Sequence, residues 1–126
     1  MRTLTTIIVI ALLLIVGSYT SYQYIQTATQ SMADHLTVVE QSIANQKWEG
    51  AFEELTTAQQ RWTEINTWWS ILLDHEEIDT IDLSIKRLEK FIDTKDMTLS
   101  LSEVSALKFL FEHISEAEQF SLNNIL

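Results

Sequence analysis

The sequence predicts an all-α protein in which an N-terminal transmembrane helix continues into an antiparallel up-down four-helix bundle. Three observations lead to this fold class. The 126 residues include no proline and only two glycines, so signals for turns are nearly absent. Residues 4–25 form one long uncharged and mainly apolar segment. The remaining chain repeats apolar residues at spacings of three and four, the pattern of helices that bury one stripe.

Residues 1–25 are predicted to form a transmembrane anchor. No charged residue occurs between Thr3 and Ala33, and Leu4 to Ile25 supplies the roughly 20 residues that a helix needs to cross a bilayer. Arg2 and the amino terminus favour a cytoplasmic start, which places the rest of the chain outside the cell membrane as a single-pass protein. A cleaved signal peptide is the alternative, although no Ala-x-Ala site follows the apolar core.

Residues 26–126 are predicted to form the extracytoplasmic helical bundle, with a short tail from about residue 115. In the second helix an apolar residue recurs every seven positions, at Trp48, Leu55, Trp62 and Trp69. Leu72 belongs to a second apolar row that is interleaved with this one. A ligand site is the alternative for this tryptophan-rich row, but heptad spacing is what a core requires. The predicted core of helices two to four is Trp48, Leu55, Trp62, Trp69, Ile78, Ile81, Ile85, Leu88, Val104, Leu107 and Phe111.

Short connections separate these helices and indicate antiparallel neighbours. Residues 45–47 lie between the first and second helices, and residues 93–99 between the third and fourth. Ser100 with Glu103 has the spacing of a capping box at the start of the fourth helix. Asp74 is the expected N-cap of the third.

The stretch WWSILLDHEEID, residues 68–79, is expected to lie near the membrane surface. The first helix rises about 20 residues from the bilayer and the second descends about 25, so at ~1.5 Å per residue the two distances nearly cancel. Trp68 is one position off the buried stripe and is expected to face outward. The predicted partner or membrane interface consists of Trp68, Ile71, Asp74, His75 and Glu76.

A metal site is the alternative for this region. His75 and Asp79 are four residues apart on one helix face, and His113 would lie opposite residue 80 in an antiparallel hairpin. Helix capping already explains the carboxylates, however, so we expect no metal and no cofactor. His35, alone on the first helix, is expected to face solvent.

Composition argues against several function classes. There is no cysteine for a thiol nucleophile, and the two glycines cannot form a phosphate-binding loop. The net charge of −10 argues against nucleic-acid binding, which needs clustered lysine and arginine. The sequence therefore predicts that the protein is not an enzyme.

The run WWSILLDHEEIDTIDLSIKRLEKFIDTKDMTLSLSEVSALKFLFEHISEAEQFSLNNIL resembles an uncharacterised family of small single-pass membrane proteins, domain of unknown function 4363, from spore-forming Gram-positive-type bacteria. The likeness is closest from Trp68 to Leu126. It implies an N-terminal anchor and a helical exterior domain, and brings no catalytic residue. Members are encoded beside small multi-pass membrane proteins of the YetF type, which implies an integral membrane partner of that kind.

Two functions follow from these observations. The first is a non-enzymatic accessory subunit that docks on an integral membrane protein through the base of its bundle. The second is an extracytoplasmic sensory or ligand-binding four-helix bundle, which would lack its usual second transmembrane helix and cytoplasmic output domain.

Overall fold

A computed structural model describes the backbone of residues 1–125, and the side chains of that stretch other than residues 72 and 118–125. This part of the chain contains four α-helices and no strand. They are α1 (Arg2–Ala44), α2 (Trp48–Leu72), α3 (His75–Asp93) and α4 (Met97–Ile125). The all-α prediction is confirmed for the described residues.

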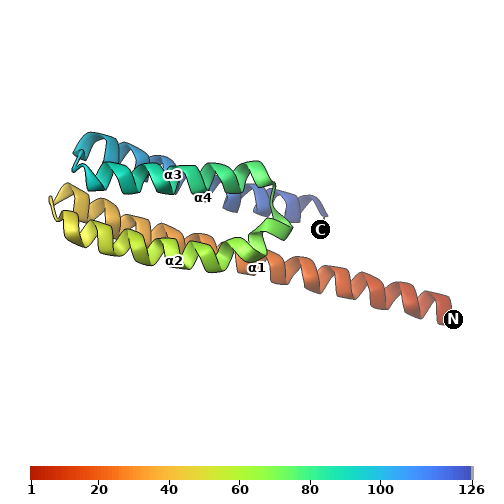
Figure 1. The fold of residues 1–126 in the computed structure, drawn as a ribbon. Coiled ribbons are helices and arrows are strands. Elements are labelled where there is room, and N and C mark those ends of the chain that lie inside the picture. The colour runs from red at the N-terminus through yellow and green to blue at the C-terminus, as the bar shows by residue number, and fades with distance from the viewer. Residues whose placement is uncertain (126) are drawn as a thin grey trace.

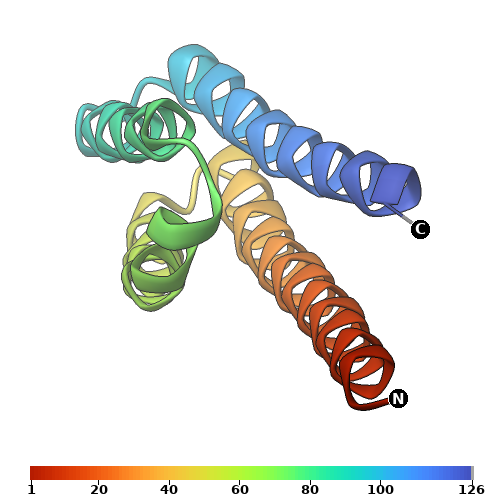
Figure 2. The same ribbon diagram turned by 90° about the vertical axis from the view of Figure 1, so that its right-hand side faces the viewer.

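Each helix packs against its neighbours in the sequence, and α1 also packs against α4. The ribbon reverses its direction at every turn in Figure 1. The α1–α2 and α3–α4 turns lie together at one end, which we call the distal end. The N-terminal part of α1 projects beyond the other end, the proximal end, where the α2–α3 turn and the end of α4 lie (Figure 1). Seen from the proximal end in Figure 2, α1 and α4 lie on one side and α2 and α3 on the other.

Helix α1 has two different environments along its 43 residues. Its N-terminal part includes an 18-residue window apolar enough to cross a membrane, and none of that window is buried. Length and composition therefore permit α1 to act as a membrane span. From Ile25 onward the same helix enters the core, where its buried residues are Ile25, Ala28, Thr29, Met32, Leu36, Val39 and Ile43.

The core is a single apolar cluster to which all four helices contribute. Ten of the eleven predicted core residues of α2, α3 and α4 are buried. Trp48 is different: it is half-buried at the distal end, where it packs against the cluster. The rings of Trp62, Trp69 and Phe111 meet edge to face, with centroids 5.5–6.0 Å apart. The side chain of Leu72 lies outside the described residues.

Helix α2 stops because the backbone becomes extended at Leu73 and Asp74. The Asp74 carboxylate then caps α3 by accepting a hydrogen bond of 3.3 Å from the Glu76 backbone N–H. Glu76 and Glu77 follow in the first turn of α3, where the helix dipole favours negative charge. Asp74 is thus the N-cap that the sequence predicts.

The capping box predicted at Ser100 is wrong. Helix α4 begins three residues earlier, at Met97, and Asp96 Oδ1 accepts a hydrogen bond of 2.9 Å from the Leu99 N–H. Aspartate and serine cap helices about equally well, so an N-cap at Asp96 is as suitable as the predicted one at Ser100. Ser100 is buried inside the helix instead. Glu103 accepts hydrogen bonds from the side chains of Ser84 and Arg87 on α3.

Two further expectations differ from the structure. There is no separate tail from residue 115, because α4 continues to Ile125. Residues 115–125 contain no proline or glycine, so nothing in that stretch breaks the helix. His35 does not simply face solvent. Its side chain is 28% exposed, and its Nδ1 lies 2.8 Å from Glu54 Oε1 on α2.

Candidate functional site

An open groove of about 650 Å³ lies between α1 and the last turns of α2 at the proximal end. We call it the proximal groove. Trp68 and Ile71 are its most exposed apolar residues, at 61% and 75% exposure. The groove is lined by Gly17, Thr20, Ser21, Tyr24, Trp68 and Ile71.

The exposure of Trp68 follows from helix geometry. Trp69 is on the buried stripe of α2 and is 0% exposed, whereas Trp68 precedes it by about 100° of rotation and points outward. Ile71 is three residues after Trp68 and shares its face. Helix α2 ends directly afterwards at Leu72. Both exposed side chains therefore lie at the end of α2, next to the part of α1 that leaves the bundle.

The other predicted interface residues lie beyond the end of α2. Asp74, His75 and Glu76 are exposed at the start of α3. Asp74 is engaged in capping, while Glu76 lines a separate groove between α3 and α4 that also contains His113. The five predicted interface residues thus lie at one end of the domain, but they do not form one surface: Glu76 lines a different groove from Trp68 and Ile71, and Asp74 and His75 line neither.

The structure does not bring His75, Asp79 and His113 together as a metal site. His113 faces Glu76, Glu77 and Thr80 across the α3–α4 groove, and its ring stacks on Phe109 with centroids 6.2 Å apart. His75 and Asp79 are exposed and do not line that groove. Within the part of the chain that the structure describes, no group of three or more histidine, aspartate or glutamate residues could hold a metal ion.

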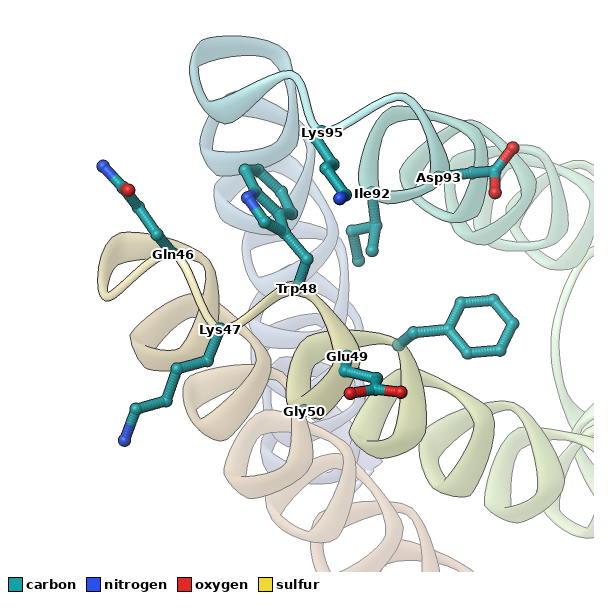
Figure 3. Close-up of a pocket in the computed structure, with 9 residues that line it drawn as sticks. Gln46, Lys47, Trp48, Glu49, Gly50, Ile92, Asp93 and Lys95 are labelled. Carbon is teal, nitrogen blue, oxygen red and sulfur yellow. The ribbon is translucent and has the colours of Figure 1, made fainter.

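A groove at the distal end has no counterpart in the sequence-based predictions. It also encloses about 650 Å³, and it lies between the α1–α2 turn and the α3–α4 turn (Figure 3). Figure 3 shows the Trp48 indole extending toward the α3–α4 turn, on the side of Ile92 and Lys95. Charged residues of both signs line it, including Lys47, Asp93 and Lys95. The only sequence signal was the shortness of the two turns, which places them at one end.

Comparison with known proteins identifies a protein family. The family model described as Domain of unknown function (DUF4363) matches residues 19–125. The matched region includes all of α2, α3 and α4, and the part of α1 that enters the core. No curated protein and no solved structure matches the chain. Since the match covers most of its length, the chain belongs to the DUF4363 family.

Proposed function

We propose that this protein is a non-enzymatic accessory subunit, anchored in the cell membrane by α1, that docks on an integral membrane protein. In this proposal α1 crosses the membrane once with its N-terminus in the cytoplasm. Residues 26–125 form an antiparallel up-down bundle on the exterior side. The observation that carries the proposal is the exposure of Trp68 and Ile71 beside residues 17–24 of α1.

Exposed aromatic and aliphatic residues that share a groove are typical of binding hot spots. Here they lie next to the turns of α1 where the aliphatic run gives way to glycine, serine, threonine and tyrosine. Tyrosine and tryptophan both favour the boundary between lipid and water. A partner that fills the proximal groove therefore has to be present at the membrane surface, as an integral membrane protein is.

The side chains of the proximal groove are suited to packing against a partner helix rather than to catalysis. Gly17 has open space around it, and Ser21 lies one turn later, so a helix of the partner can approach α1 closely here. The Thr20 hydroxyl already donates to the Val16 carbonyl oxygen at 2.8 Å. Among the described side chains, those that line the proximal groove include no carboxylate, imidazole or amine that could act in acid–base catalysis. The family resemblance adds that a YetF-type protein is a suitable first partner to test.

Photo-crosslinking in intact cells tests the proposal. A photoreactive amino acid replaces Trp68 or Ile71 in the full chain, and the control position is Phe52, which is 45% exposed at the distal end. We expect positions 68 and 71 to crosslink one membrane protein that position 52 does not reach. The proposal fails if positions 68 and 71 label only lipid, or the same proteins as position 52.

The distal groove favours the second candidate function, an extracytoplasmic ligand-binding bundle. Its test is a thermal-shift screen of small molecules against the full chain in detergent. A compound that raises the melting temperature of the parent and of Trp68→Ala, but not of Trp48→Ala, would support ligand binding there. If no compound shows this pattern, the distal groove has no such role.

A further inference from the structure

The groove between α3 and α4 at the proximal end is a second surface with a defined chemistry. It encloses about 380 Å³. Its floor is apolar, since Ile81 and Ile114 are 0% and 3% exposed and Leu110 packs against the core. Glu76 and Glu77 lie along the α3 side, and His113 lies on the α4 side. We call this surface the acidic groove.

Within the described residues, neither glutamate of the acidic groove takes part in an ion pair. Residues 118–126 include no lysine, arginine or histidine, so that end of α4 supplies no cation either. The rim of the groove is therefore negative and open to a positively charged partner.

The charged residues of the whole domain are also unevenly distributed, with the acidic excess at the proximal end. The proximal half of the bundle consists of residues 18–34, 62–85 and 109–126, which contain ten aspartates and glutamates and no lysine or arginine. Among those with described side chains, only Glu64 pairs with a lysine or arginine, namely Arg61 at 3.2 Å. The cations that follow Arg2 all lie outside these three stretches.

This distribution determines what the acidic groove can accept. An anionic lipid surface is repelled by it. A lysine or arginine suits it well, because the hydrocarbon stem of such a side chain lies on an apolar floor while its charged end reaches the glutamates. Basic residues are depleted from the exterior loops of membrane proteins, so a basic exterior segment would distinguish one partner from others.

We propose that the acidic groove binds a basic segment, lysine or arginine next to an apolar residue, on the exterior side of the membrane protein that docks at the proximal groove. This inference rests on the proposed function for the identity of the partner, and on charge complementarity for its chemistry. In the sequence, only the α2–α3 turn separates Ile71 of the proximal groove from Glu76 of the acidic groove, so both grooves lie at the proximal end of the domain, where the proposed partner docks.

A peptide-binding experiment tests the chemistry independently of the cellular partner. The full chain is reconstituted in nanodiscs of neutral phosphatidylcholine. The probe is a fluorescent 14-residue helical peptide of leucine and lysine on opposite faces, and its matched control has glutamate in place of each lysine. We expect only the lysine peptide to bind. The double variant Glu76→Gln/Glu77→Gln should weaken this binding about tenfold, as loss of two exposed ion pairs does.

The matched control variant is Glu49→Gln/Glu53→Gln, which removes the same charge from exposed positions of α2 at the distal end. It should bind the lysine peptide as the parent does. Thr80→Lys adds a cation to the acidic groove and should also weaken binding of the lysine peptide. Equal weakening by both double variants would overturn the inference, because it would mean attraction by net charge alone. The inference would also be overturned if Glu76→Gln/Glu77→Gln and Thr80→Lys both bound the lysine peptide as tightly as the parent protein does.

A cellular measurement separates this inference from the proposed function. The photoreactive residue is placed at position 109, which is 64% exposed and stacks on His113 beside the groove. We expect it to label the same protein as position 68, and Glu76→Gln/Glu77→Gln to reduce labelling from 109 but not from 68. Labelling from 68 alone overturns the inference and leaves the proposed function intact. If position 68 labels no specific membrane protein, while the lysine peptide still binds and the glutamate peptide does not, the proposed function is wrong and the inference about the acidic groove stands.

Discussion

The indole N–H of Trp62 on α2 donates a hydrogen bond of 2.6 Å to Asp82 Oδ1 on α3. Trp62 is 4% exposed, so this bond satisfies a polar group at the edge of the core. Trp69, seven residues later on the same stripe, is 0% exposed, and its N–H has no partner among the described residues. The two tryptophans therefore differ in chemistry although they hold equivalent positions in the sequence repeat.

Trp62→Phe should lower the free energy of unfolding more than Trp69→Phe does, by about 1 kcal/mol, because only the first loses a hydrogen bond and leaves the half-buried Asp82 carboxylate without its donor. Trp62→Ala should cost about 3–5 kcal/mol through the cavity that it creates. Chemical unfolding of the full chain in detergent, followed by circular dichroism, measures these differences. Trp68→Ala is the control and should change stability by less than about 0.5 kcal/mol, since Trp68 is exposed. Equal costs for the two Phe variants would show that the hydrogen bond contributes nothing.

Ser100→Ala should stabilise the protein by about 1 kcal/mol. Its hydroxyl is buried without a hydrogen-bond partner among the described residues, and alanine removes that penalty while favouring the helix. The capping box read from the sequence predicts the opposite sign, a loss of about 1 kcal/mol. Asp96→Ala, which removes the observed cap, should cause such a loss. Melting temperatures of the two variants distinguish the two assignments: a lower melting temperature for Ser100→Ala would restore the capping box.

Gln26 and Ser115 exchange two hydrogen bonds and so connect α1 with α4 at the proximal end. Gln26 Nε2 donates to the Ser115 carbonyl oxygen at 3.0 Å, and Ser115 Oγ donates to Gln26 Oε1 at 2.7 Å. A double-mutant cycle with Gln26→Ala and Ser115→Ala should give a coupling energy of about 1 kcal/mol. The exposed pair Gln30 and Asp34, four residues apart on α1, is the control and should couple by less than about 0.5 kcal/mol. Coupling no larger than that of the control pair would mean that this contact does not connect the helices.

Cysteine crosslinking checks the level at which α2 ends beside α1. The chain has no native cysteine, and both glycines have room for a side chain, with no atom nearer than 3.9 Å to an added Cβ. In membranes, Gly17→Cys/Trp68→Cys should be joined by a short bismaleimide, because both positions line the proximal groove. Gly50→Cys/Trp68→Cys should not be joined, because position 50 lies at the distal end. Efficient joining of the second pair, or none of the first, would contradict the observed register of α1 and α2.

Periodicity was a good guide to the helices and their buried faces. Ala51, Leu55, Ala58, Trp62, Ile65 and Trp69 are buried, and spacings of three and four predict this because they place side chains on one face of a helix. The position of Trp68 also followed from its offset from the stripe. Such predictions work where one strong effect, burial of apolar surface, decides the outcome.

Choices between similar local options were not predictable in the same way. Asp96 and Ser100 are both suitable N-caps, and the energy that separates them is too small for a single sequence to show. The continuation of α4 to Ile125 was missed because the apolar spacing was followed only as far as Ile114, although residues 115–125 contain no proline or glycine that would end the helix. The acidic groove likewise depends on how α3 and α4 face one another, which sets Glu76 and Glu77, rather than His75 and Asp79, opposite His113.

Helix α1 passes from its exposed apolar part into the bundle without a break, over a length of about 65 Å. In the proposed topology, the part of α1 in the membrane and the part in the bundle therefore tilt together as one rigid helix. Transmembrane helices are inclined by about 20° on average, and inclination of that size would carry the far turn of the domain sideways by about 10 Å. Bilayer thickness, or a partner that changes how α1 leans, would therefore reposition the entire exterior domain.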